Sequence, residues 1–224
     1  MGKRRITLLF LALLIACPLA GCSRKKEYED LSREQARVIA NLNQEVSRLQ
    51  DDLNRLKESK GDLERAKAEL ESKLKQELAD GGLSLAMGER GLVVTVLDRV
   101  LFDSGKAELK ESAKLTLEKV SGVLKSRVPM HLVYVEGHTD NDPIRYSGWR
   151  SNWELSTARA TEVIHYFIES QGVRAERMIA TGFGEYHPVA SNETLEGKAR
   201  NRRVEIVISP KKLTEFGTQP IVRT

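Results

Sequence analysis

The segment LVYVEGHTDNDPIRYSGWRSNWELSTARATEVIHYFI (residues 132–168) contains a strand, a loop and a helix in direct succession. The apolar run 132–136 predicts the strand, and a loop with proline and glycine follows it. Ser151 and Glu154 have the spacing of a capping box, which predicts a helix that begins at Ser151. Apolar residues then repeat at helical spacing, and they are Ala160, Val163, Ile164, Phe167 and Ile168.

The flanking segments continue this alternation of strands and helices. Leu92–Leu97 is a nearly continuous apolar run, which is typical of a buried strand. The other expected elements are a helix over 110–126 with Ala113, Leu117, Val120 and Leu124 on one face, strands over 178–183 and 204–208, and a short helix over 195–199. We therefore expect an α+β domain over residues 88–210, with the order β-α-β-α-β-(α)-β and helices on one face of a mixed sheet. Residues 211–224 lack periodicity, and we expect a flexible tail there.

A long helix is expected before this domain. Residues 28–79 contain no proline and one glycine, and Asp80-Gly81-Gly82 ends the segment as a hinge. Apolar residues recur at alternating steps of three and four, at Ile39, Leu42, Val46, Leu49, Leu53, Leu56, Leu63, Leu70 and Leu74. This heptad pattern predicts a coiled-coil stalk over residues 28–80 and a parallel homodimer through residues 39–77. The alternative is a single charged helix that packs on its own domain or on the envelope.

The first 22 residues predict a secretory signal and a lipid anchor. A basic stretch ends at Arg5, and an apolar run of about 11 residues follows, which is too short to span a membrane. Leu19-Ala20-Gly21-Cys22 resembles the lipobox of bacterial lipoproteins. The resemblance implies removal of residues 1–21, acylation of Cys22, a short linker over 22–27 and, from Ser23, delivery to the outer membrane facing the periplasm. An ordinary signal peptide is the alternative.

Charge and cysteine content exclude two classes of function. Removal of residues 1–21 takes away three of the 36 basic residues, so 33 basic and 32 acidic side chains would leave a net charge of +1. Such a chain has no general attraction to phosphate backbones, and we expect no nucleic-acid partner. Both cysteines, Cys17 and Cys22, lie before the predicted domain, which therefore has neither a disulfide nor a cysteine metal site.

The strand end at Asp140 and the helix that carries Arg159 form a candidate binding site. Asn152, Ser156 and Arg159 lie on one helical face that can look toward Asp140. An aspartate and an arginine held close together suit a zwitterion, such as the free end of diaminopimelate in peptidoglycan. From spacing alone, a structural salt bridge between loop and helix explains the same two residues.

Five motifs in order resemble the OmpA-like peptidoglycan-binding domain shared by OmpA, Pal and MotB. They are Phe102-Asp103-Ser104, Gly137-His138-Thr139-Asp140, Asn152 with Leu155–Ala160, Gly182–Glu185 with Pro188, and Asn201–Ile206. The resemblance implies non-covalent binding of peptidoglycan, with Asp140 and Arg159 holding the diaminopimelate ends. It also implies that Asp103, Asn152 and either Arg202 or Arg203 line the same pocket. The loop between Asp140 and Asn152 is longer than in OmpA or Pal and is more similar to MotB.

Two rival functions fit the sequence poorly. A flagellar stator needs a membrane-spanning helix with a proton-carrying acid. The apolar run is too short to span a membrane and contains no Asp or Glu. A metal hydrolase built on His138, Asp140 and Asp142 lacks a second ligand cluster, and we expect no enzyme activity, cofactor or metal. One alternative stays open, in which the coiled coil recruits an envelope or motor complex and the wall domain is an accessory anchor.

Overall fold

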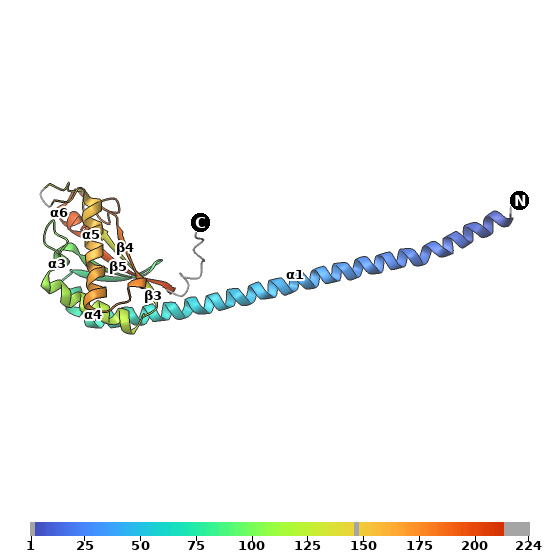
Figure 1. The fold of residues 1–224 in the computed structure, drawn as a ribbon, viewed down its shortest axis with the longest axis horizontal. Helices are drawn as coiled ribbons and strands as arrows, with labels where there is room; N and C mark the ends of the chain where they lie inside the picture. Colours follow the sequence, from blue (N-terminus) through green and yellow to red (C-terminus); the bar gives the residue numbers. More distant parts are fainter. Residues whose placement is uncertain (1–2, 146–147, 213–224) are drawn as a thin grey trace. The chain divides into compact units, whose positions relative to one another are not determined.

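The computed structural model describes residues 3–145 and 148–212, with side chains described for residues 25–145 and 148–210 (Figure 1). The side chains of the predicted signal segment and of Cys22, and the tail beyond residue 212, lie outside what is described. Helix α1 runs from Lys3–Lys73, and the chain divides into two compact units, Met1–Arg55 and Leu56–Thr224. Within the described residues, no helix combines the length and apolar character needed to cross a membrane.

The second unit contains a five-stranded mixed sheet with strand order β1-β2-β5-β3-β4. Only β3 and β4 pair in parallel, and every other neighbouring pair is antiparallel. The strands are β1 (Leu83–Gly88), β2 (Gly91–Leu97), β3 (His131–His138), β4 (Met178–Gly182) and β5 (Arg203–Lys212). The helices are α2 (Lys75–Ala79), α3 (Asp98–Leu101), α4 (Glu111–Ser126), α5 (Asn152–His165) and α6 (Leu195–Asn201), with short turns η1 (Tyr166–Ser170) and η2 (Ala175–Arg177). The predicted α+β fold with a preceding long helix is confirmed.

The apolar stripes predicted for α4 and α5 form the core against one face of the sheet. Leu117 and Val120 of α4, and Ala160 and Val163 of α5, are fully buried together with Val135 of β3. Ser151 is the N-cap of α5, as the capping box predicts, and its Oγ accepts a hydrogen bond from the Trp153 amide at 3.1 Å. Local patterning therefore predicted both helices and the face that each one buries.

Strand β1 was not expected, because Gly81-Gly82 was interpreted as a hinge and the domain was expected to begin at residue 88. Leu83 pairs with Val96 and Gly88 pairs with Gly91, so β1 forms a hairpin with β2 at the edge of the sheet. Its side chains are mostly exposed, which gives the strand a weak apolar signal. Gly91 has φ +124° and lies so close to the Ile208 carbonyl that a Cβ atom would clash, so this turn requires glycine.

The C-terminal part of α1 belongs to the compact unit of the domain. Leu63, Ala66 and Leu70 of α1, and Leu74 directly after it, are all buried in the core. The Ser59 hydroxyl donates a hydrogen bond to the Pro210 carbonyl at 2.7 Å, which joins this helix end to β5. The domain therefore begins near Leu56 rather than at residue 88.

The predicted dimer seam over residues 39–77 is consequently divided in two. Ile39, Leu42, Val46, Leu49, Leu53 and Leu56 are all more than half exposed. The seam residues from Leu63 to Leu74 are covered by the domain of their own chain, so they are not free for a partner helix. The structure contradicts the expected seam from Leu63 onward, where the helix packs on its own domain as the single-helix alternative has it, and the seam over residues 39–56 stays a prediction.

Candidate functional site

A pocket of about 790 Å³ lies where β2, β3, α5 and α6 end or begin, within the second unit. It is lined by Asp98 after β2, by Thr139 and Asp140 after β3, by Asn152 and Arg159 of α5, and by Arg202 after α6. The predicted residues Asp103, Asp140, Asn152 and Arg159 all line it. Asp140 and Arg159 therefore face one cleft, as the interpretation of the sequence requires.

Two glycines allow α5 to approach the strand ends closely. A Cβ atom on Gly137 of β3 would lie 2.0 Å from the Ser156 carbonyl, and one on Gly182 of β4 would lie 2.1 Å from Thr157 Oγ1. Ser156 is fully buried at this contact and its Oγ accepts a hydrogen bond from the Gly184 amide at 3.0 Å. The close packing places the first two turns of α5 against the loop that carries Asp140.

Arg159 is buried at the floor of the pocket, with 3% of its surface exposed. Its Nη1 lies 3.0 Å from a carboxylate oxygen of Asp98, and its Nε donates to the Lys106 carbonyl at 2.9 Å. The guanidinium also lies over the Phe102 ring, 5.1 Å from the centroid. Burial lowers the pKa of Arg159 while Asp98 opposes that change. These contacts fix the guanidinium in one orientation.

Asp140 is also buried, and it pairs with Arg202 rather than with Arg159. Its second carboxylate oxygen accepts a hydrogen bond from the Asp142 amide at 3.1 Å. The sequence predicted that Asp140 and Arg159 lie near one another, and each proves to have a separate partner of opposite charge. The pocket thus contains two ion pairs, Asp98–Arg159 and Asp140–Arg202.

The choice between Arg202 and Arg203 is resolved in favour of Arg202. Arg203 does not line this pocket, because its Nε donates to Glu205 Oε1 at 2.6 Å and its Nη2 donates to the His187 carbonyl at 3.2 Å. Arg203 is therefore not a residue of this pocket, although the resemblance left both arginines open. The alternation of side chains along a strand indicates the same result. Arg202 is two residues before Val204 and four before Ile206, so it falls on their core side, whereas Arg203 falls on the opposite side.

Asp98 is a pocket residue that sequence reasoning missed. It follows the buried strand β2 directly, in the way that Thr139 and Asp140 follow β3. Burial raises the pKa of Asp98, and the positive charges of Arg159 and Arg202 oppose that rise. An acid just after an apolar strand is the sequence signal that points to Asp98, as it points to Asp140.

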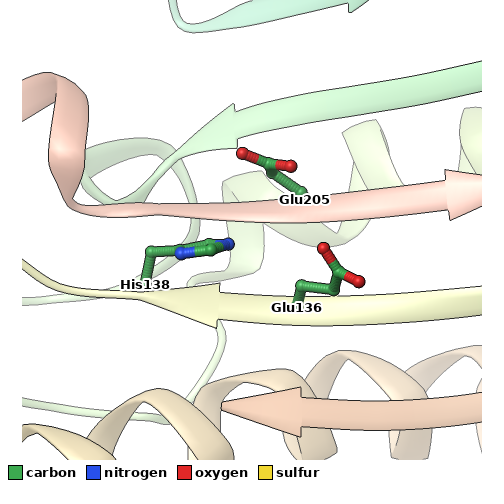
Figure 2. Close-up of side chains that lie close together, drawn as sticks. All are labelled: Glu136, His138 and Glu205. Carbon is green, nitrogen blue, oxygen red and sulfur yellow. The ribbon is translucent and has the colours of Figure 1, made fainter. Parts of the chain in front are cut away.

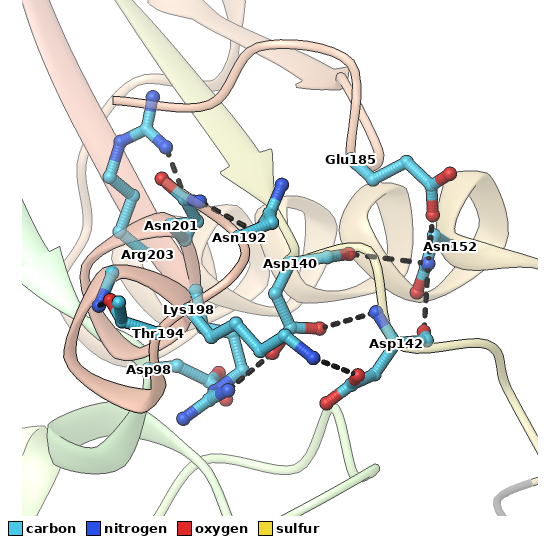
Figure 3. A network of polar contacts seen from close by, with 12 residues as sticks. Asp98, Asp140, Asp142, Asn152, Glu185, Asn192, Thr194, Lys198, Asn201 and Arg203 are labelled. Carbon is cyan, nitrogen blue, oxygen red and sulfur yellow. Dashed lines mark hydrogen bonds and ion pairs between the residues drawn. The ribbon is translucent and has the colours of Figure 1, made fainter. Parts of the chain in front are cut away.

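Asn152 holds the loop after β3 in place, as Figure 3 shows. Its Nδ2 donates to the carbonyl of Asp142 at 3.1 Å and to Glu185 Oε2 at 2.6 Å, with a longer contact of 3.4 Å to the Asp140 carbonyl. Lys198 Nζ lies 2.6 Å from Asp142 Oδ1 and attaches the same loop to α6. Asn152 lines the pocket, and its amide nitrogen positions the segment that carries Asp140.

The rim of the pocket is more exposed and also charged. Asp103, with 60% of its side chain exposed, lies 3.5 Å from Lys110 Nζ and 3.7 Å from Lys106 Nζ. Pro143 and Ile144, in the loop after β3, also line the pocket. The arrangement offers both signs of charge at the floor and at the rim, which suits a ligand that carries an ammonium and a carboxylate.

The chain is similar to several known proteins. Residues 101–202 match the profile of the OmpA family. Motility protein B of Bacillus subtilis is 39% identical over 145 residues, which are 65% of this chain and 55% of that protein. The probable lipoprotein YiaD of Escherichia coli is 40% identical over 140 residues, which are 62% of this chain and 61% of that protein. The chain thus spans little more than half the length of these curated relatives.

A solved structure is similar in both sequence and fold. The cell wall anchor of the T6SS from Pseudomonas aeruginosa is 34% identical with a TM-score of 0.56, over 62% of this chain and 96% of that one. The region that matches the OmpA family, residues 101–202, contains Asp140, Arg159 and Arg202 of the two ion pairs. Asp98 lies three residues before this region begins. Through this domain the chain belongs to the OmpA family, whose members are non-enzymatic peptidoglycan-binding proteins.

Proposed function

We propose that the pocket binds the free ammonium and carboxylate of diaminopimelate in the peptidoglycan stem peptide. The main support for this proposal is that one cleft contains two ion pairs, Asp98–Arg159 and Asp140–Arg202. A zwitterionic ligand presents the same two charges, so its carboxylate can be held by the guanidinium groups and its ammonium by Asp140. Asp103 at the rim completes the set of binding residues, and Asn152 positions Asp140.

Competition between wall chemistries tests this assignment. The purified chain is expected to sediment with sacculi that contain diaminopimelate, and free diaminopimelate is expected to release it. Lysine-containing sacculi are the matched control, because lysine in the stem peptide lacks the second carboxylate. The expected preference is at least about 30-fold, since loss of a buried charged contact costs about 2–5 kcal/mol. Equal binding to both kinds of sacculi would contradict the assignment.

We further propose that Cys22 carries a lipid that anchors the chain in the outer membrane, so that the protein tethers this membrane to the wall. The lipobox-like Leu19-Ala20-Gly21-Cys22 supports this, and the relative in Escherichia coli is named a probable lipoprotein. Acyl chains contribute about 0.8 kcal/mol per buried methylene to membrane binding. The relative in Bacillus subtilis, a motility protein, supports instead the second candidate, an accessory anchor for a motor or envelope complex.

Replacement of Cys22 with alanine is expected to abolish incorporation of radiolabelled palmitate and to release the protein from the membrane fraction. Cys17→Ala is the matched control, because Cys17 lies inside the predicted signal segment, and this variant should be labelled like the parent chain. Undiminished labelling of Cys22→Ala would rule out this cysteine as the lipid site.

The exposed seam over residues 39–56 supports a parallel dimer. Its a positions Ile39 and Val46 are β-branched and its d positions Leu42 and Leu49 are leucine, the combination that favours two strands. The double variant Leu42→Glu, Leu49→Glu is expected to be monomeric in analytical ultracentrifugation, where the parent chain is dimeric. The control Gln44→Glu, Ser47→Glu introduces the same charges outside the seam. A monomeric parent chain would exclude the dimer.

A further inference from the structure

We propose that Glu136, His138 and Glu205 form a binding site for a divalent transition-metal ion such as zinc. Glu136 and His138 alternate on β3, and Glu205 of β5 lies directly opposite Glu136 in the antiparallel register. All three therefore project from the sheet face that α4 and α5 do not cover, whereas Val133 and Val135 face the core. Figure 2 shows the imidazole directed toward the space between the two carboxylates.

The three groups are close enough to share one ion. One ligand atom from each residue lies within 4.8 Å of the other two. In a tetrahedral zinc site with bonds of about 2.0–2.2 Å, neighbouring ligand atoms lie about 3.3 Å apart, so modest side-chain rotations bring the groups to bonding distance. Imidazole nitrogen and carboxylate oxygen are both ligand types that zinc accepts, and water can take the fourth position of such a three-ligand site.

His138 provides the independent evidence for a ligand at this place. It is 4% exposed, and among the described residues neither of its ring nitrogens has a hydrogen-bond partner. Buried polar side-chain atoms are bonded in the large majority of cases, so an imidazole with two unpartnered nitrogens is unusual. The ring stacks on Phe183, with centroids 5.1 Å apart, which holds its plane.

The protonation state of His138 agrees with a ligand role. Burial lowers the pKa of His138 to about 3, with smaller contributions from Arg203 and His187. The imidazole is therefore neutral near pH 7, and a neutral imidazole is the form that coordinates metal ions.

Two arginines balance the carboxylates when no metal is bound. Arg90, in the turn between β1 and β2, donates to both oxygens of Glu136 at 2.6 and 2.8 Å and lies 3.8 Å from Glu205. Its side chain is 57% exposed, so it can rotate into solvent when a dication replaces its charge. Arg203 donates a hydrogen bond to one oxygen of Glu205 and leaves the other oxygen for the ion. It thereby orients Glu205 without contacting the metal itself. Arg90 thus competes directly with the metal.

This site is separate from the peptidoglycan pocket. None of the three ligands lines that pocket, although His138 precedes its residues Thr139 and Asp140 directly. The proposed set also differs from the His138, Asp140 and Asp142 combination considered from the sequence, with which it shares only the histidine. Failure of either proposal therefore leaves the other intact.

Zinc titration of the full chain tests the site. The chain is expressed with Cys17→Ser and Cys22→Ser, without a polyhistidine tag and in mild detergent, so that no thiol competes for the metal. Isothermal titration with Zn²⁺ is expected to show one saturable site, and Co²⁺ is expected to give the visible absorption of a four-coordinate complex. No saturable binding by this chain would overturn the proposal.

Variants in the same background locate the ion. Glu136→Gln, which keeps the side-chain volume, is expected to weaken Zn²⁺ binding at least about 100-fold, beyond the 10- to 100-fold typical of outer-sphere changes. Arg90→Gln is expected to strengthen binding, because it removes the competitor. His165→Ala changes an exposed histidine on α5 and is expected to leave the affinity unchanged. Unchanged affinity in Glu136→Gln, with an unaltered circular dichroism spectrum, would overturn the assignment.

Discussion

Replacement of Asp140 with asparagine is expected to weaken binding to sacculi at least about 30-fold while the domain stays folded. Asparagine keeps the shape of the side chain and loses the charge that pairs with Arg202 and that would hold the ligand ammonium. Loss of one member of a buried charged contact costs about 2–5 kcal/mol, and about 1.4 kcal/mol corresponds to a factor of ten. Co-sedimentation over a range of sacculus concentrations measures the change.

Asp80→Asn is the matched control for Asp140→Asn. It makes the same chemical change at an exposed residue that does not line the pocket, so its binding should equal that of the parent chain. If Asp140→Asn binds sacculi as tightly as Asp80→Asn does, the pocket does not hold the stem peptide.

Arg159→Lys is a more informative test of Arg159 than Arg159→Ala. Arg159→Ala would leave Asp98 buried without a partner, and such a change typically destabilises a protein by about 3–5 kcal/mol. Arg159→Lys keeps a positive charge near Asp98 and removes the two-pronged guanidinium, so it separates folding from ligand binding. Truncation of Arg159 is therefore expected to disturb the fold as well as the pocket.

Leu70→Ala is expected to lower the free energy of unfolding by about 2–5 kcal/mol, because Leu70 of α1 is fully buried in the domain core. Chemical denaturation followed by tryptophan fluorescence measures this change, since both tryptophans, Trp149 and Trp153, belong to the domain. The result tests whether the end of the long helix is an integral part of the fold.

Leu115→Ala provides the reference for Leu70→Ala. Leu115 lies on α4 of the same domain and is 65% exposed, so its truncation should change the stability by no more than about 0.5 kcal/mol. Equal effects of the two substitutions would mean that residues 63–74 do not pack on the domain in solution.

Local patterns in the sequence determined much of the domain. The capping box at Ser151 and the stripe from Ala160 to Phe167 predicted α5, because helix starts and buried faces depend on residues within a few turns of each other. Asp140 was likewise predicted from a local pattern, because it comes just after an apolar strand. Helical spacing placed Asn152 and Arg159 on one face, Asp103 was implied only by the resemblance to the OmpA-like domain, and all three line the pocket.

Contacts between distant segments were decided only by the tertiary structure. The partner of Arg159 is Asp98, 61 positions earlier, and the partner of Asp140 is Arg202, 62 positions later, so no local period could indicate either pair. The heptad stripe of α1 is continuous in sequence, yet the part after Leu56 covers its own domain, because an apolar helical face specifies burial without specifying the surface that buries it. The sequence by itself established which side chains are buried or charged, and only the packed fold established which of them meet.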